Sequence, residues 1–181
     1  MTDLKYSKQE SFWILRAQSG DKEAFDKLLE AIEKPLFRYI YHLVEEYALA
    51  EDILQEVFIL IYRKIGWLHE PKLFRAWAYR IASREAFKRL KKEKRWSEQI
   101  RDEEVLETIP SQFADSIDKR ELLEQLSTLI LKLSPASRAV LILHYQNDLS
   151  LNEIAEILGI AVGTVKSRLA YGLEKLRQEI K

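Results

Sequence analysis

The sequence predicts an all-α protein built from two small helical domains joined by a flexible linker, the C-terminal one containing a helix-turn-helix. Five glycines and four prolines are few turn-forming residues for 181 positions, and the segments between them repeat apolar residues at spacings of three and four. That periodicity stops over residues 96–120, a stretch longer than the usual connection inside a compact domain. We therefore expect a first domain over 1–95 and a second over 121–181.

The composition excludes several classes of protein. The chain has no cysteine, so it cannot hold a disulfide, a catalytic thiol or a zinc ion bound by cysteine. No apolar run approaches the roughly 20 residues of a membrane-spanning helix, and the first ten residues lack the apolar core of a signal peptide. Since 47% of the residues are hydrophobic, packed cores are feasible, and we expect a folded cytoplasmic protein.

The N-terminal domain begins with three expected helices. The first covers about 9–19, and Asp21 can then accept a hydrogen bond from the first turn of the second. A third helix is expected after Pro35. The next segment, AEDILQEVFILIYRKI over 50–65, is apolar on more than one side, which predicts a helix that is central to a bundle or docks a partner.

The charges are unevenly distributed although the formal net charge is zero. Residues 72–95 carry ten Lys or Arg against two Glu, a balance of +8, whereas 96–120 carries three basic and seven acidic side chains. A helix over about 72–94 should bury an apolar stripe that includes Trp77 and place cations on its other side. Most runs of charged residues are solvated helix surfaces. This excess of positive charge, with Trp77 and Tyr79 among the cations, nevertheless favours a surface that binds nucleic acid.

The C-terminal domain contains two helix starts with clear capping signals. Ser134 and Pro135 suit the N-cap and first position of one helix, and SLNE over 150–153 is a capping box. In LNEIAEILGIAVGTVKSRL, a small Ala155, a turn-forming Gly159 and an apolar Val165 have the spacing that lets two helices pack at a steep angle. This spacing favours a DNA-binding helix-turn-helix over an ordinary helical hairpin. The exposed residues near the start of its second helix are then Gly163, Thr164, Lys166, Ser167 and Arg168.

No constellation for catalysis or for a cofactor is present. Asp52 and Glu56 form an i, i+4 carboxylate pair, but no histidine has the Glu-x-x-His spacing of helical metal sites. The three histidines are isolated, and no P-loop or GxGxxG occurs. We therefore expect no catalytic residues, no metal site, no cofactor and no enzymatic activity.

The chain resembles the extracytoplasmic-function (ECF) group of bacterial RNA polymerase sigma factors, in the sigma-70 family, from about Asp21 to Ile180. The resemblance lies in the order and separation of AEDILQEVF, FRAWAYRIAS with its basic run, the acidic linker, LSPASRAVLILHY, LSLNEIAEILGI and GTVKSRL. It implies that 1–95 is region two, that 121–181 is region four, and that the linker threads the RNA exit path of the polymerase. The implied partners are core RNA polymerase and promoter DNA, joined in many members by an anti-sigma factor.

The resemblance also assigns residues to three surfaces. It places polymerase docking on Asp52, Ile53, Gln55, Glu56 and Phe58. It places minus-ten recognition on the loop 66–73 and on Arg80, Arg84, Lys88, Arg89 and Lys91. It places minus-35 recognition on Thr164, Lys166, Ser167, Arg168 and Tyr171. The sequence departs from the family pattern at positions 84 and 88, where asparagine and aspartate are frequent, near 171 and 173, where arginines are frequent, and at Ala161, where a capping residue is common.

A helix-turn-helix regulator that acts without binding core polymerase is the alternative interpretation. It predicts DNA binding by the chain alone, as a dimer on a palindromic site. It leaves the apolar segment around 52–58 and the acidic linker without a role.

Overall fold

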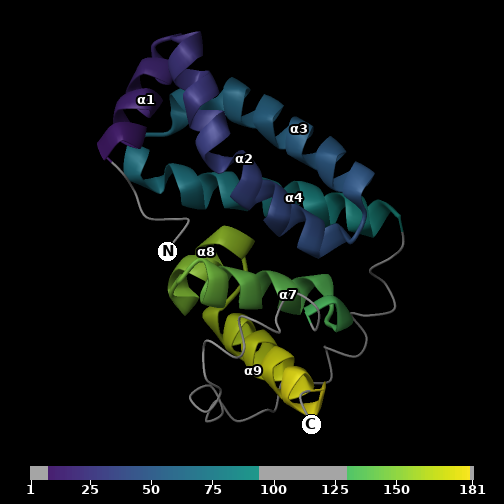
Figure 1. Cartoon of the computed structure of the whole chain (residues 1–181). Coiled ribbons are helices and arrows are strands. Elements are labelled where there is room, and N and C mark those ends of the chain that lie inside the picture. Colours follow the sequence, from purple (N-terminus) through teal and green to yellow (C-terminus); the bar gives the residue numbers. More distant parts are fainter. Residues whose placement is uncertain (1–7, 94–129, 180–181) are drawn as a thin grey trace.

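The computed structural model describes residues 8–93 and 130–179, and every regular element in them is helical, which confirms the all-α prediction (Figure 1). The expected linker over 96–120 lies outside the described residues. The helices are α1 (Lys8–Gln18), α2 (Lys22–Val44), α3 (Tyr47–Lys64), α4 (Phe74–Lys92), α7 (Pro135–Leu141), α8 (Leu151–Leu158) and α9 (Val162–Glu179). Short helical turns lie between them at Ile65–Trp67, Pro71–Leu73, Ile130–Lys132 and Ile142–Gln146.

Helix α2 is continuous through Pro35, where the sequence predicted a break between two helices. The apolar stripe made by Leu28, Ile32, Leu36 and Ile40 keeps helical spacing on both sides of the proline, and all four side chains are buried. Proline removes one backbone hydrogen bond from a helix interior, but burying each large aliphatic side chain contributes about 1.5–3 kcal/mol. Packing of this stripe therefore outweighs the local cost.

A buried hydrogen-bonded chain links α2 to α4. The Ser83 hydroxyl donates to the Tyr79 carbonyl oxygen at 2.7 Å, so the Tyr39 hydroxyl, 2.7 Å from the Ser83 Oγ, is the donor to it. Burial raises the pKa of the Tyr39 phenol well above its ordinary value, which keeps the proton in place. The ring of Tyr79 packs against that of Tyr39 with centroids 5.1 Å apart, so Tyr79 belongs to the core although the sequence places it among cations.

The C-terminal unit begins its helices as the sequence predicted. The Ser134 side chain accepts from the Ser137 amide at the start of α7, and Ser150 with Glu153 forms the complete capping box of α8. Helix α8 ends at Gly159, whose φ of 67° lies in the left-handed region. Helix α9 then packs on α7 so closely that a Cβ on Gly172 would lie 2.6 Å from the Leu141 Cδ1 atom.

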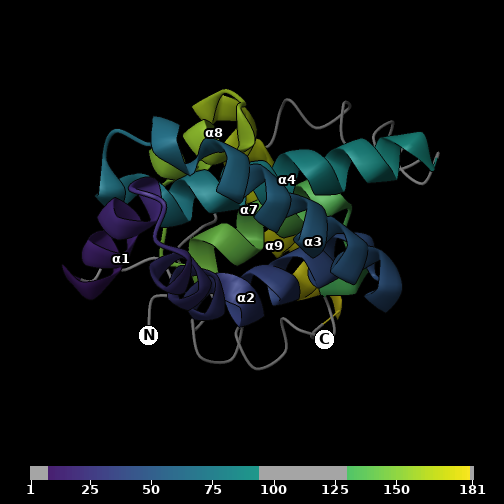
Figure 2. The ribbon, with the colours of Figure 1, turned by 90° about the horizontal axis from the view of Figure 1, so that it is seen from above.

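The two units pack on each other, with α7 against α2 and α8 against α4 (Figure 2). Arg138, on α7, is 2% exposed and donates to the carbonyl oxygens of Leu133 at 2.7 Å, Leu131 at 3.0 Å and His42 at 2.8 Å. Its guanidinium also pairs with the Glu45 carboxylate just after α2. One buried side chain therefore satisfies carbonyl groups from both units.

The left-handed turn at Gly159 gives a stability prediction. Replacing Gly159 by Ala places a Cβ in the left-handed region, so the free energy of unfolding should fall by about 1–2 kcal/mol in a denaturant titration. Gly163→Ala is the matched control, since Gly163 has open space around its Cα and lies in the first turn of α9. Equal stability losses in both variants would contradict this account of the turn.

Candidate nucleic-acid interface

Helix α4 presents a cationic face to solvent. Its apolar residues pack against α2 and α3, which turns its cations outward. Among the residues that sequence analysis assigned to it, Arg89 is half-buried and the others are exposed: Arg80, Arg84, Lys88 and Lys91. Lys88 pairs with Glu85 at 3.1 Å, an exposed pair of little energetic weight. Within the described residues, neither Arg80 nor Arg84 forms an ion pair, so both charges are available to phosphate groups.

A cavity of about 320 Å³ opens beside this cationic face, at the loop 65–73 between α3 and α4, which we call the cavity loop. Its lining is mainly aromatic and aliphatic, with a few charged or polar groups: Lys64, Trp67, Leu68, His69, Glu70, Leu73 and Trp77. Trp67 is 73% exposed, an unusual position for the largest apolar side chain. Sequence analysis placed this loop only by resemblance and did not single out Trp67. Trp77, expected in the core, is only partly buried and lines the cavity.

The outward side of α3 carries the second surface. Asp52, Gln55 and Glu56 are exposed, and Phe58 is half-buried. Ile53, which sequence analysis assigned to polymerase docking, is 1% exposed and packs in the core, so it is not available for direct contact. The helical repeat instead aligns Ile59 and Tyr62, 45% and 62% exposed, with Asp52 and Gln55. We call Asp52, Gln55, Glu56, Ile59 and Tyr62 the α3 docking face.

Sequence reasoning missed Ile59 and Tyr62 because both belong to the continuous apolar run Val57–Tyr62, in which exposed and buried positions look alike. The signal that identifies them is their spacing of seven and ten residues from Asp52, which places all three on one side of a helix. The Tyr62 ring also packs edge-on against Phe25 of α2 with centroids 5.2 Å apart. That contact fixes the orientation of an exposed aromatic ring on this side of α3.

The helix-turn-helix forms as its spacing predicted. Val165 is fully buried and Ala155 is 6% exposed, so α8 and α9 approach closely. Two amides, those of Gly159 and Ile160, donate to the Ala155 carbonyl at 2.8 and 3.1 Å. The side chain of Ala161 offers no capping acceptor, so the turn and the buried Val165 fix where α9 begins. Packing therefore replaces the missing cap.

The residues assigned to DNA contact lie along the first half of α9. Lys166 is exposed, and the others are partly buried: Thr164, Ser167, Arg168 and Tyr171. The Ser167 hydroxyl donates to the Gly163 carbonyl at 2.7 Å, and the Lys175 ammonium lies 5.8 Å from the centre of the Tyr171 ring. Helix α9 lies on the far side of α7 from α2 (Figure 1). Its surface is therefore distinct from that of α4.

Comparison with known proteins identifies the family. Residues 28–96 match the family described as "Sigma-70 region 2" and residues 123–176 match "Sigma-70, region 4". The ECF RNA polymerase sigma factor SigW of Bacillus subtilis is 34% identical over 179 residues, which cover 93% of this chain and 95% of that protein. The chain belongs to the ECF sigma factors. It is therefore an RNA polymerase sigma factor, a transcription initiation factor whose partners are core polymerase and promoter DNA.

Other relatives agree with this assignment. The ECF sigma factor BldN of Streptomyces coelicolor is 29% identical over 160 residues, 85% of this chain and 59% of that protein. The solved structure of CnrH in complex with the cytosolic domain of CnrY has a TM-score of 0.64 at 21% identity and covers 96% of this chain and 97% of that one. RpoE from Bartonella quintana, solved with the anti-sigma factor NepR, has a TM-score of 0.61 at 23% identity, covering 86% and 96%. At these identities the solved structures support the fold of this sigma factor.

The described part of this sigma factor shows no cluster of three or more His, Asp or Glu side chains that would suit a metal ion. None of its described helices is long and apolar enough to cross a membrane.

His42 is a titratable group at the junction between the two units, beside Arg138. Its Nδ1 atom is buried without a hydrogen-bond partner in the part of the chain that the structure describes, and its carbonyl oxygen accepts from Arg138. Burial lowers the pKa of the His42 imidazole, and the positive charges of Arg38 and Arg138 lower it further. A neutral imidazole therefore suits this site, and protonation opposes the packing around it.

This lowered pKa predicts a pH-dependent stability. Below the ordinary pKa of 6.5 the unfolded chain binds a proton that the folded protein rejects, so stability is complete above that value and is lost as the pH falls toward the folded pKa. Unfolding free energies measured between about pH 7.5 and pH 5.5 should decrease more steeply in the wild type than in His42→Asn. His69→Asn, at an exposed histidine, should keep the wild-type slope. Parallel curves for the wild type and His42→Asn would contradict the buried neutral imidazole.

Proposed function

We propose that this sigma factor uses three separate surfaces for the binding steps of transcription initiation. These surfaces lie on two domains, 1–95 and 121–181, which the linker 96–120 connects. The α3 docking face binds core RNA polymerase, the α4 cations with the cavity loop hold the minus-ten element, and α9 reads the minus-35 element. The observation that carries this proposal is that acidic and apolar residues on α3, cations on α4, and a separate helix-turn-helix are exposed together in one small protein.

Docking on the polymerase is supported by the chemistry of the α3 face. Ile59 and Tyr62 provide an apolar centre, and Asp52 and Glu56 provide negative charge beside it. Interfaces of this kind gain affinity from buried aromatic and aliphatic anchors, while the charged rim sets orientation and excludes wrong partners. The complementary surface on the polymerase would be apolar at its centre, with basic residues at its border. Ile53 contributes by packing the helix in place.

Minus-ten recognition is supported by the pairing of α4 with the cavity loop. Arg80, Arg84 and Lys88 form a row about one helical turn apart, which suits the phosphates of a DNA strand. The aromatic walls of the cavity, Trp67 and Trp77, suit stacking with an unpaired base. Opening a duplex costs a few kcal/mol for each unstacked base, and phosphate contacts with base capture offset that cost. The protein holds the separated strand and changes no bond.

Minus-35 recognition is assigned to α9 by its position after the helix-turn-helix turn. Lys166 and Arg168 near the start of the helix can donate to guanine or to phosphate oxygens. The arginines that the family often carries near Tyr171 and Leu173 are absent, and each lost phosphate contact lowers the salt dependence of binding by roughly one unit of slope. We infer that the upstream element is held with fewer phosphate contacts than in many relatives.

An anti-sigma factor is a further partner that we propose, since a solved protein of the same fold, RpoE, is bound to the anti-sigma factor NepR. The chain would act in the cytoplasm, where polymerase and promoter DNA are found. The regulator that works without polymerase is not favoured, because it leaves the α3 docking face unused and predicts no match to sigma region two.

A pair of variants tests this division of labour. Asp52→Ala combined with Gln55→Ala should weaken binding to core polymerase by about tenfold, or 1.4 kcal/mol, while leaving promoter contacts of the assembled complex unchanged. Arg168→Ala should leave polymerase binding unchanged and weaken promoter binding by about 1–3 kcal/mol if it contacts a base edge. Glu33→Ala, at an exposed carboxylate on α2, is the control for a simple change of charge.

The measurements are co-elution of the purified chain with core polymerase and initiation of a specific transcript. Equal losses of polymerase binding in the α3 and α9 variants would argue against separate surfaces. Tight binding of the chain alone to a palindromic site, with no co-elution, would overturn the proposed function.

A further inference from the structure

Helix α1 has no role in the surfaces above, and the region-two match begins only at residue 28, after α1 has ended. Its contacts nevertheless converge on the cavity loop, because α1 packs against both short helical turns of that loop as well as against α2. A helix that held only the bundle together would need contacts with α2 alone.

Gln18, the last residue of α1, binds the start of the cavity loop. Its side-chain Nε2 donates to the carbonyl oxygen of Ile65 at 2.9 Å and to that of Leu68 at 2.7 Å. Both partners are acceptors, so only the amide nitrogen can meet them, and both of its hydrogens are used. These two carbonyl groups flank Gly66 and Trp67. The position of the most exposed aromatic side chain at the cavity is therefore set by one amide group from α1.

The other end of the loop is also bound by α1. Arg75, two residues after the loop, donates through Nε to the Glu10 carboxylate oxygens at 3.1 and 3.2 Å, and its Nη2 pairs with the same carboxylate. Both side chains are largely buried, Glu10 at 8% and Arg75 at 14% exposed. Glu10 and Gln18 lie about 12 Å apart along α1, given a rise of about 1.5 Å per residue. One rigid helix thus spans the loop from end to end.

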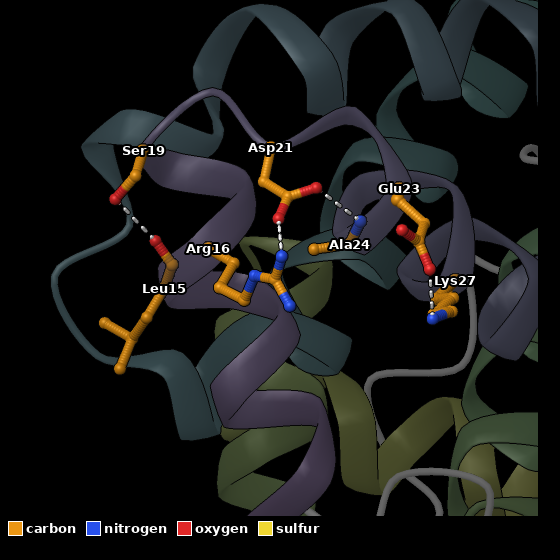
Figure 3. A network of polar contacts seen from close by, with 7 residues as sticks. All are labelled: Leu15, Arg16, Ser19, Asp21, Glu23, Ala24 and Lys27. Carbon is orange, nitrogen blue, oxygen red and sulfur yellow. Dashed lines mark hydrogen bonds and ion pairs between the residues drawn. The ribbon is translucent and has the colours of Figure 1, made fainter.

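The end of α1 is itself fixed in place (Figure 3). The Ser19 hydroxyl donates to the Leu15 carbonyl at 3.0 Å, and Arg16 pairs with Asp21, which accepts from the Ala24 amide at 3.1 Å. The Ala24 hydrogen bond and the Arg16 charge hold the pKa of the Asp21 carboxyl below its ordinary value. Gln18 therefore lies at the end of a helix whose following turn is anchored by contacts with both α1 and α2.

We propose that α1 holds the cavity loop in a fixed position and that Gln18 is a positioning residue for capture of the unpaired minus-ten strand. The backbone hydrogen bonds within the loop are short-range: Leu68 N donates to Ile65 O at 3.1 Å, Leu73 N donates to Glu70 O at 2.9 Å, and Phe74 N donates to Pro71 O. Without Gln18, the segment carrying Trp67 loses both of its side-chain hydrogen bonds to α1, and the wall of the cavity is less firmly positioned. This inference rests on the proposed role of the loop in minus-ten recognition.

The test uses the full chain assembled with core polymerase, and a forked promoter DNA whose minus-ten region is already unpaired. Gln18→Leu removes the donors at similar size, and Gln18→Glu places a carboxylate against two carbonyl oxygens. Both variants should bind the forked DNA at least about fivefold more weakly, the loss expected for one net hydrogen bond or more. Affinity for core polymerase and for a duplex carrying only the upstream element should not change. Gln9→Leu, the same substitution at an exposed position of α1, should match the wild type on every substrate.

Amide hydrogen exchange in the free protein supplies the second measurement. Exchange over residues 66–70 should accelerate in Gln18→Leu while that of α2 and α4 stays at the wild-type rate. A loss of affinity for core polymerase, forked DNA and duplex DNA together, or faster exchange throughout, would show a merely structural role and overturn the proposal.

Trp67→Ala separates the two proposals. If Trp67→Ala weakens forked-DNA binding and Gln18→Leu does not, the proposed role of α1 and Gln18 in positioning the loop is wrong, whereas the proposed role of the loop in strand capture stands. If neither variant weakens forked-DNA binding although exchange of the loop accelerates in Gln18→Leu, the loop does not capture the strand, and the proposed minus-ten site fails together with the role given to Gln18.

Discussion

The rotation of α4 about its own axis is the constraint on which the proposed minus-ten surface depends, and it is fixed by the packing of the apolar side of α4 together with the buried hydrogen bond between Tyr39 and Ser83. A shift of one residue along a helix turns its faces by about 100° and would carry Arg80 and Arg84 toward the core. Burying such charges without partners costs far more than one hydrogen bond supplies. Because Ser83 has one donor on α2 and one acceptor on its own helix, the apolar side stays inward and the cations stay outward.

The same arrangement explains how a chain with no net charge can bind DNA. The positive charge is concentrated on α4 and balanced by acidic segments elsewhere, so the field near the cationic face is local. Arg138 is a cation that is not available to DNA, since its buried guanidinium binds the His42 carbonyl oxygen and the Glu45 carboxylate at the end of α2. Burial lowers the pKa of its guanidinium, an effect that the Glu45 carboxylate opposes, and the group stays charged at neutral pH.

Sequence reasoning predicted the helical class, the capping box at Ser150 and the turn at Gly159, because each depends on residues within a few positions of one another. For the same reason it predicted the exposure of Arg80, Arg84, Lys88 and Lys91, whereas Arg89 is half-buried. It divided α2 at Pro35 and put Ile53 on a docking surface, since both depend on burial against other helices. The contact of Gln18 with a loop almost fifty residues away has no local signal, and only the folded chain shows it.

The assignment of α3 to polymerase and α4 to DNA is tested most directly by photocrosslinking within the complete complex of sigma factor, core polymerase and promoter. A photoreactive amino acid in place of Gln55 should label a polymerase subunit, and one in place of Arg84 should label the minus-ten DNA strand. Labelling of DNA from position 55 and of polymerase from position 84 would contradict the division of surfaces described here.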